Sequence, residues 1–200
     1  MLASASPARL RTLRSAGIPA DVVVSGVDES AVEAAGAAAL AGTLARMKAQ
    51  AVADRLRGEG EALVLGCDSV LAFDGEIFGK PADPAEATKR WQRMRGGTGV
   101  LHTGHCLIHV DEASHEVNTA EEVGATTVRF AEVSDAEIAA YVATGEPLRV
   151  AGAFTIDGIG GPFVAGVDGD PGTVIGLSLP LLRRLLAALG VPIHAFWHVP

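Results

Sequence analysis

The segment VLGCDSVLAF, residues 64–73, constrains the fold most, because it is apolar enough for a buried strand yet carries Asp68 near its middle. A carboxylate in a buried strand costs free energy unless hydrogen bonds or a neighbouring cation compensate for the lost water. Two interpretations of Asp68 follow from this. The carboxylate either accepts backbone amide hydrogens near a strand end, or it acts as a base in a binding site.

The dipeptide Asp74–Gly75 after this segment predicts a β-hairpin whose second strand leads to Lys80. A three-residue loop would place Lys80 opposite Asp68 on the same face. A two-residue loop would place Lys80 opposite Ser69 and turn Asp68 to the other face. Either register makes Asp68 and Lys80 neighbours, which suits a structural ion pair or a water-activating base next to a phosphate-binding cation.

The rest of the chain alternates between helical and extended patterns, which indicates an α/β fold, and 200 residues suit one domain, residues 1–200. Helix signals, including caps at Ser6, Asp83 and Ser134, predict helices over about 7–16, 35–57, 84–95, 135–144 and 173–190. Strand signals predict strands over 1–5, 20–27, 100–110 and 124–133, and two more between 150 and 172 around a GIGG turn.

Charge and composition exclude several classes of protein. A net charge of −8 disfavours nonspecific binding to nucleic acid or to a membrane surface, so a phosphate ligand requires a local basic pocket. The two cysteines lack the spacing of a zinc site or a disulfide framework. Neither an apolar run of about 18 residues nor a leader pattern is present, so a cytoplasmic protein is expected.

Lys48 departs from the pattern of the predicted helix 35–57, because its helical angle places it on the apolar stripe. A lysine stem often lies along apolar surface with its ammonium in water, so this position has a harmless interpretation. The stripe consists of Leu40, Leu44, Met47 and Ala51, with Val52 and Leu56 at its edge.

Other polar residues suggest ligand sites. Arg9 lies early in the first predicted helix, where its guanidinium, with Ser4 and Ser6, suits an anion site. The loop acids Asp28 and Glu29 suit a divalent cation or plain solvation. The strand histidines 102, 105 and 109 have spacings that cannot bring all three to one face, so a zinc site is not expected there.

Several segments together resemble the Maf family in order and spacing, nearly end to end. The acid before the hairpin, the GKP after it and the AG-aromatic segment near residue 152 are jointly specific. The matching segments are LASASPARLRTLRSAGI, VDES, LARMKAQAVA, LGCDSVLAFDGEIFGKP, HTG, VSDAEIAAYVATGEPLRVAGAFTIDG and VIGLSLPLL.

This resemblance implies a mixed, elongated α/β sheet flanked by helices, similar to inosine triphosphatases, with two lobes around a central cleft and a possible homodimer. It implies a hydrolase of acid anhydrides, in which water attacks the α-phosphorus of a nucleoside triphosphate and releases a monophosphate and pyrophosphate. It also implies a divalent metal, Mg²⁺ or Mn²⁺, and a substrate among modified nucleotides. The alternative is a nucleotide-sensing protein that regulates cell division or septum formation without essential turnover.

The resemblance also assigns roles to matching residues. Asp68 corresponds to the proton acceptor, and Glu29 to an acid that holds the metal together with Asp68. Lys48, Lys80 and Arg9 correspond to phosphate-side cations, the two lysines being catalytic. The residues that it implies for substrate binding are Ser4, Ser6, Arg9, Ser69, Thr103 and Asp157.

Three positions depart from the family pattern, and all three are expected to set specificity. Ala8 replaces a basic or aromatic residue after the SP dipeptide, Ser69 replaces threonine or glutamine after the acid, and Asp157 replaces an amide or glutamate before the glycine. The chain therefore matches neither the subgroup for thymidine and uridine triphosphates nor the one for methylated guanosine triphosphate. A lysine usual shortly before AG is also missing, with Arg149 and Val150 in its place.

Overall fold

A computed structural model describes residues 1–110 and 117–197. The chain divides into two compact units, each discontinuous in sequence. Unit 1 comprises Met1–Asp68, Thr103–Gly124 and Gly176–Pro200, and unit 2 comprises Ser69–His102 and Ala125–Ile175. A single domain over residues 1–200 stays a prediction, and so does a cleft between two lobes.

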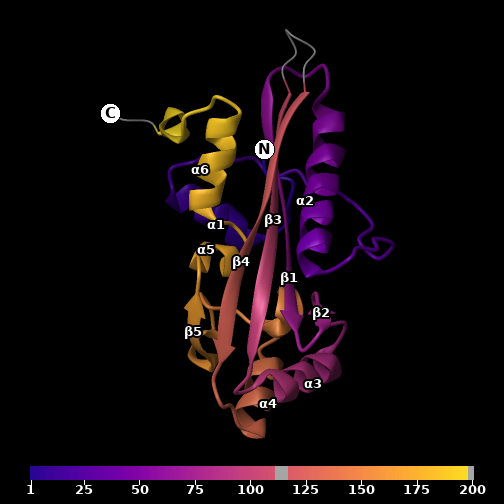
Figure 1. The fold of residues 1–200 in the computed structure, drawn as a ribbon, viewed down its shortest axis with the longest axis vertical. Coiled ribbons are helices and arrows are strands. Elements are labelled where there is room, and N and C mark those ends of the chain that lie inside the picture. Colours follow the sequence, from indigo (N-terminus) through magenta and orange to yellow (C-terminus); the bar gives the residue numbers. More distant parts are fainter. Residues whose placement is uncertain (111–116, 198–200) are drawn as a thin grey trace. The chain divides into compact units, whose positions relative to one another are not determined.

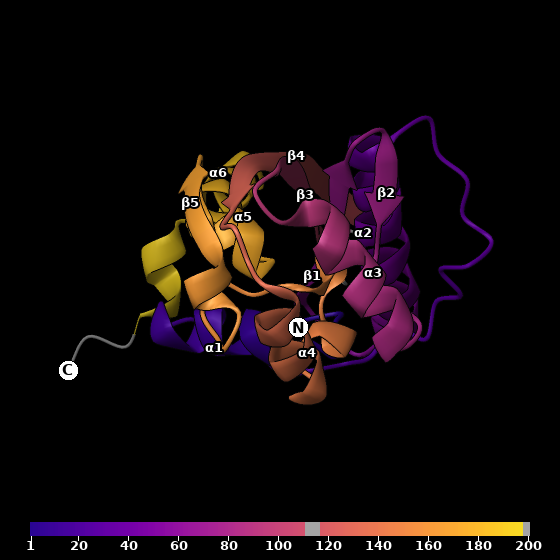
Figure 2. The same ribbon diagram turned by 90° about the horizontal axis from the view of Figure 1, so that it is seen from below.

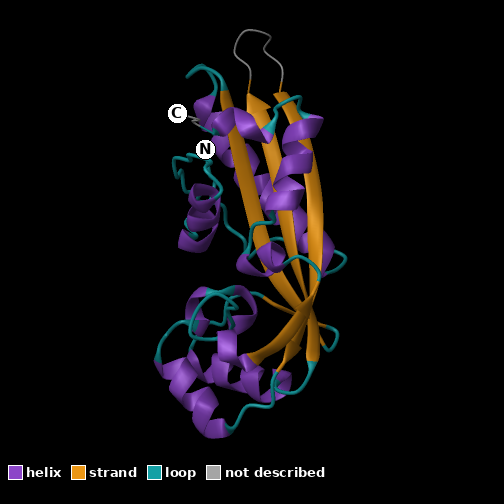
Figure 3. Ribbon diagram, turned by 90° about the vertical axis from the view of Figure 1, so that its left-hand side faces the viewer, coloured by secondary structure: helices purple, strands orange, loops and turns teal. Residues whose placement is uncertain are grey.

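A five-stranded sheet with order β2-β1-β3-β4-β5, flanked by helices, confirms the α/β expectation (Figure 1). The strands are β1 (Ala62–Phe73), β2 (Glu76–Phe78), β3 (Thr98–Val110), β4 (Val117–Phe130) and β5 (Val164–Asp168). The three long strands β1, β3 and β4 contribute residues to both units. In Figure 3 the strands are orange and the helices that flank them are purple. The α-helices are α1 (Pro7–Ser15), α2 (Ala37–Ala53), α3 (Pro84–Met94), α4 (Asp135–Ala143), α5 (Pro171–Ile175) and α6 (Leu179–Ala188).

Unit 1 buries both faces of its strands, because alternate residues of a strand point to opposite sides. Val64 of β1 and Ile108 of β3 pack with α2, whereas Leu65 and Leu107, one position away in each strand, pack with α1 and α6. Figure 1 shows α2 on one side of these strands and α1 and α6 on the other. Asp68 has the parity of Val64, so the alternation turns it toward α2.

Helix α2 approaches the sheet closely because glycine lies beneath it in two strands. A Cβ atom on Gly66 would lie 2.2 Å from the carbonyl oxygen of Ala45, and one on Gly104 would lie 2.2 Å from that of Ala41. Ala41, Ala45 and Ala49 are fully buried at this contact. Glycine inside a strand often marks such an approach of another backbone segment.

Gly66→Ala is expected to destabilise the protein by about 1–3 kcal/mol, because the added methyl group meets helix backbone rather than a side chain that can move away. Urea denaturation measures this change. Gly36→Ala is the control, since its added Cβ meets nothing within 4 Å. Equal unfolding free energies for the two variants would show that α2 can shift without cost.

The predicted stripe of α2 is wrong in one respect. Met47 is 36% exposed, and the helix buries its small residues instead. The close contact with the sheet is made mainly by alanine, and Leu44 and Val52 of the predicted stripe are buried as expected. Lys48 is buried on this face, so its unusual position is real.

Unit 2 has an aromatic core centred on Trp91 of α3. The Trp91 ring makes edge-to-face contacts with Phe130, Tyr141 and Phe163 at centroid distances of 5.6–5.9 Å. Its indole N–H donates to the carbonyl oxygen of Ala153 at 2.8 Å. Helices α3 and α4 lie side by side against this core (Figures 1 and 2).

The predicted helix caps are confirmed. Ser6 accepts a hydrogen bond from the Arg9 amide at the start of α1, and Asp83 accepts one from the Glu86 amide at the start of α3. Ser134 and Glu137 form a reciprocal capping box at the start of α4. These caps involve residues within four positions of one another, which is why the sequence predicts them well.

The hairpin has the two-residue loop. Phe73 pairs with Glu76 across the loop Asp74–Gly75, in which both residues have positive φ, 49° and 77°. This is the conformation of a type I′ turn, which matches the twist of antiparallel strands. The register excludes the three-residue alternative, and with it the direct pairing of Lys80 with Asp68.

Two predicted strands near the N-terminus are wrong. Of the segments 1–5 and 20–27, only Leu2 and Val22 form β-bridges; both of the bridges made by Leu2, to Val22 and to Leu65, are parallel. Val22 and Val24 are 43% and 55% exposed. These valine side chains are therefore not buried against a second layer, and the segment continues as a loop.

Two predictions in the last third are also wrong. The helix expected over 173–190 is broken into α5 and α6 at Gly176, whose φ is 109°, and Ser178 caps the restart. The segment around Gly152 is a 3₁₀ turn rather than a strand, with positive φ at Gly152 and Ala153. The GIGG segment is therefore not a hairpin turn between two strands. No helix among residues 1–110 and 117–197 is long and apolar enough to cross a bilayer.

Candidate active site

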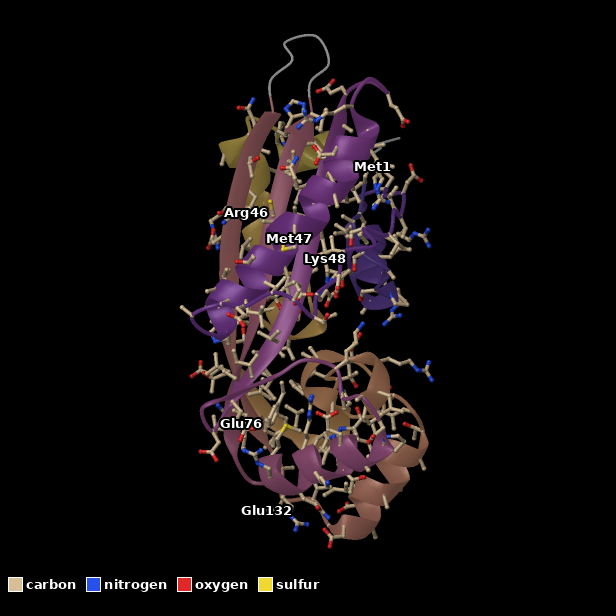
Figure 4. All side chains as sticks on the ribbon, turned by 90° about the vertical axis from the view of Figure 1, so that its right-hand side faces the viewer. Met1, Arg46, Met47, Lys48, Glu76 and Glu132 are labelled. Carbon is tan, nitrogen blue, oxygen red and sulfur yellow. The ribbon has the colours of Figure 1, made fainter. Side chains whose placement is uncertain are left out.

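Lys48, Asp68 and Glu29 form a charged cluster in unit 1. The Lys48 ammonium lies 2.6 Å from a carboxylate oxygen of Asp68 and 2.6 Å from one of Glu29. The side chains of Lys48 and Asp68 are only 11% and 10% exposed, whereas that of Glu29 is 52% exposed. Of the three successive residues Arg46, Met47 and Lys48 labelled on α2 in Figure 4, only Lys48 is buried.

Burial is the largest influence on Asp68 and raises the pKa of its carboxyl group above the ordinary value of 3.8. The charges of Lys48 and Arg9 and the hydrogen bond from Lys48 act in the opposite direction without cancelling it. A carboxylate with a raised pKa binds a proton more readily than an exposed one. Asp68 therefore has the property that a general base requires.

The loop that carries Glu29 is attached to the unit through Arg55 and is braced by a turn of its own. The Arg55 guanidinium donates to the carbonyl oxygens of Val24, at 2.9 Å, and of Ser25. Asp28 accepts hydrogen bonds from the amide and hydroxyl of Ser30, at 3.0 and 2.7 Å. These bonds lower the pKa of Asp28 and engage it in the turn, so Glu29 is the loop acid that reaches Lys48.

Arg9, Ser4 and Ser6 come together as the sequence predicts, in a network beside Asp68. Arg9 Nη1 donates to the Ser4 hydroxyl oxygen at 2.9 Å and to the carbonyl oxygen of Cys67 at 2.8 Å. Arg9 Nε donates to the carbonyl oxygen of Gly176 at 2.8 Å, and Ser4 also accepts from the Ser6 amide at 3.2 Å. The guanidinium thus joins α1 to β1 at the residue before Asp68.

Thr103 is fully buried, and its backbone carbonyl group contacts His105. The His105 Nδ1 lies 3.1 Å from the Thr103 carbonyl oxygen, and the Ser178 amide donates to His105 Nε2 at 3.0 Å. This geometry assigns the ring hydrogen to Nδ1. His109 bonds Glu61 instead, at 2.8 Å.

Neither thiol near the cluster is suited to act as a nucleophile. Burial raises the pKa of Cys67 to about 11 and that of Cys106 to about 12. Both thiols therefore stay protonated at neutral pH, and the thiolate is the reactive form. Cys67 contributes its backbone carbonyl group, which binds Arg9.

Three of the remaining predicted residues, Ser69, Lys80 and Asp157, belong to unit 2. Ser69 follows Asp68 in β1 and is half-buried, whereas Lys80 and Asp157 are exposed. Ala8, in unit 1, is half-buried at the start of α1. Convergence of Lys80 with Asp68 stays a prediction, because these two residues belong to different units.

Sequence reasoning missed Glu146, which holds the loop around Asp157. Burial would raise the pKa of Glu146, but its hydrogen bonds outweigh burial and lower it. The carboxylate therefore stays ionised and fixes residues 155–160. Its donors are the Tyr141 hydroxyl (2.9 Å), the Thr155 hydroxyl (2.6 Å), the Ile159 amide (3.0 Å) and the Gly160 amide (2.9 Å).

The cluster offers two carboxylates to a cation. Residues 1–110 and 117–197 contain no group of three or more acidic, histidine or cysteine side chains arranged for a metal. Glu29 and Asp68 nevertheless converge on the positive charge of Lys48. Two carboxylates suit Mg²⁺ when substrate phosphates and water complete its ligands, since this ion is seldom held by protein groups alone.

Comparison with known proteins identifies relatives over nearly the whole chain. A protein of Salinispora tropica named nucleoside triphosphate pyrophosphatase is 65% identical over 199 residues, covering 98% of this chain and 86% of the relative. Proteins of the same name from Streptomyces coelicolor and a Synechococcus species are 58% and 56% identical, covering 98% and 93% of this chain and 93% and 100% of the relatives. The family described as Maf-like protein matches residues 1–189, and the chain belongs to this family.

Proposed function

We propose that this protein is a nucleoside triphosphate pyrophosphatase that hydrolyses its substrate to a nucleoside monophosphate and pyrophosphate. Relatives of that name at 56–65% identity support the activity. The observation that carries the mechanism is the Asp68 carboxylate, which is buried, has a raised pKa and lies 2.6 Å from the Lys48 ammonium.

In the proposed reaction, water attacks the α-phosphorus while Asp68 accepts one of its protons. A bond forms between the water oxygen and phosphorus, and the bond from phosphorus to the oxygen that bridges the β-phosphate breaks. Pyrophosphate leaves with the bonding electrons. Lys48 holds the Asp68 carboxylate in place and supplies positive charge near the phosphates, where charge develops in the transition state.

Glu29 and Asp68 would hold a divalent cation, Mg²⁺ or Mn²⁺, together with the phosphates. The cation would neutralise phosphate charge that a protein with a net charge of −8 does not otherwise attract. Lys48 lies between the same two carboxylates. Binding of a cation therefore requires Lys48 to share them or to turn toward a phosphate oxygen.

The residues proposed to bind substrate are those that the family resemblance implies. Arg9 and Lys80 serve as phosphate-side cations, and Ser4 and Ser6 line the site. Ala8, Ser69 and Asp157 set the preference for a base and direct the enzyme to modified nucleotides. The fixed loop around Asp157 supports the last assignment, because a rigid loop discriminates between bases better than a flexible one. We also propose that the protein forms a homodimer.

The test is a panel of standard and modified nucleoside triphosphates with the purified protein and Mg²⁺. Each product mixture is scored for monophosphate with pyrophosphate and for diphosphate with orthophosphate. We expect monophosphate with pyrophosphate from at least one substrate. Formation of diphosphate and orthophosphate would mean attack at the terminal phosphorus and would overturn the mechanism. Tight nucleotide binding without turnover would instead support a sensing role.

A further inference from the structure

We infer that Glu86 and Arg90 of α3 are positioning residues. They clamp the backbone on both sides of Lys80 and so fix the backbone position from which the Lys80 side chain extends. The inference rests on the proposed function in one respect, the assignment of Lys80 to a substrate phosphate. All the contacts that support it lie within unit 2.

The clamp is a closed ring of hydrogen bonds around Lys80 and Pro81. Before Lys80, the carbonyl oxygen of Gly79 accepts a hydrogen bond from Arg90 Nη1 at 2.7 Å. After Pro81, the amide of Ala82 donates to Glu86 Oε2 at 2.7 Å. The ring closes because Arg90 Nη2 binds Glu86 Oε1, one helical turn away on α3.

A third contact holds the same carbonyl group from another direction. The amide of Gly152 donates to the Gly79 oxygen at 3.1 Å. Gly152 can present this amide because its φ is 70°, a conformation that glycine adopts without strain. Two independent segments of unit 2, α3 and the turn at Gly152, therefore hold the residue before Lys80.

The clamping side chains are themselves held in place. The Arg90 guanidinium stacks 4.8 Å from the ring centroid of the buried Phe78, and its side chain is only 13% exposed. Asp83 accepts a hydrogen bond from the Glu86 amide at 2.8 Å and so fixes the first turn of α3. Such support limits the rotamers that the two clamping residues can adopt.

The negative charge of Glu86 strengthens the clamp at neutral pH. The hydrogen bond from the Ala82 amide is the largest influence on Glu86 and lowers the pKa of its carboxyl group below 4.5, and Arg90 adds to this effect. A lowered carboxyl pKa means that the contribution to stability is present above 4.5 and is lost as the pH falls through the lowered value. The clamp is therefore weaker in acid, where Glu86 is protonated and loses its ion pair with Arg90.

The arrangement leaves Lys80 exposed while its flanking backbone is fixed. The four side-chain torsions of Lys80 can still rotate. The fold therefore fixes the position of the Lys80 backbone but not that of its ammonium group. A phosphate-binding cation on such a segment meets its ligand without first ordering a loop, which is the benefit of preorganisation.

Arg93 provides a matched control. Its guanidinium also stacks on Phe78, at 5.4 Å, and also forms an ion pair, with Glu76 at 2.9 Å. Its two hydrogen bonds run to Glu76 of β2, labelled in Figure 4, and not to residues 79–82. Arg90→Met and Arg93→Met therefore remove the same side chain from the same helix and ring, and only the first opens the clamp.

The experiment compares these two variants in the purified protein. Arg90→Met is expected to lower kcat/KM for pyrophosphate release about tenfold to a hundredfold, whereas Arg93→Met leaves it within about twofold. Amide hydrogen exchange at Ala82 and Gly152 should speed up in Arg90→Met alone. Glu86→Ala should act in the same direction, and Glu86→Gln should restore most of the activity, because its amide oxygen can still accept from Ala82. Glu86 is at the surface, so this pair tests the clamp even if Arg90→Met does not fold.

A double-mutant cycle that combines Arg90→Met with Lys80→Met tests whether the clamp acts through Lys80. In the Lys80→Met background, Arg90→Met should cause no further loss of turnover. A further tenfold loss there, equal losses in the Arg90 and Arg93 variants, or unchanged exchange at Ala82 would each overturn the inference. Full activity of Lys80→Met would overturn the inference as well. Because that variant would still release pyrophosphate, the proposed reaction would stand.

Discussion

Asp68→Asn is expected to lower the rate of pyrophosphate release by about 10²–10⁴-fold, because the amide cannot accept the proton of the attacking water. The fold should remain intact. Burial raises the pKa of Asp68, so its ionised form is less favourable in the folded protein than in the unfolded chain. An asparagine of the same shape removes that cost, and Lys48 keeps Glu29 as an ion-pair partner at 2.6 Å, so the variant should stay folded at neutral pH.

Turnover and urea denaturation measured on the same sample test this prediction. Asp54→Asn is the control, because Asp54 is an exposed acid of unit 1 that pairs with Arg57. It should change neither quantity appreciably. An Asp68→Asn protein with the activity of the parent would end the assignment of Asp68 as the base, and a large loss of stability would assign a structural role to it.

Lys48→Met is expected to destabilise the protein by about 3–5 kcal/mol at neutral pH, because it leaves a buried carboxylate without its cation. The pH dependence follows from the carboxyl group. Without Lys48, the pKa of Asp68 rises further, since the lysine charge and hydrogen bond lower it in the parent. A raised carboxyl pKa gives stability that is present at low pH and is lost as the pH rises through the raised value.

The loss in Lys48→Met should therefore be largest at neutral pH and shrink toward the ordinary aspartate value of 3.8. Urea denaturation across this range, in a chelating buffer, measures it. Arg46→Met is the matched control on the same helix, because its ion pair with Glu121 is exposed and should contribute at most about 1 kcal/mol. The double variant Lys48→Met with Asp68→Asn should recover much of the stability. A loss independent of pH would contradict the buried-pair explanation.

Local interactions explain which parts of the fold the sequence predicts. The cap of α3 at Asp83 joins residues three positions apart, and the type I′ turn at Asp74–Gly75 needs only a short glycine-containing loop. The misfit of Asp68 and Lys48 is also visible in the sequence, because each is a charged residue within an otherwise apolar pattern. The structure pairs these two residues directly at 2.6 Å.

Contacts between distant residues decide what the sequence does not show. The valine-rich segment 20–27 satisfies the composition of a strand, yet lacks a neighbouring strand along most of its length. The buried face of α2 depends on Gly66 and Gly104, which are 38 positions apart and become significant only when a helix lies across both. The partners of Arg9 include the carbonyl groups of Cys67 and Gly176, which nothing in its own segment indicates.

The amino-acid sequence by itself therefore determined the family, the helix caps, the hairpin and the charged residues that do not belong in a core. Only the tertiary structure decided that Lys48 lies between Asp68 and Glu29, and that Glu86 and Arg90 hold the backbone around Lys80. The physical reason is range. Caps and turns form between neighbours in the chain, whereas a buried charge or a backbone carbonyl group acquires its partner only when separate segments pack together.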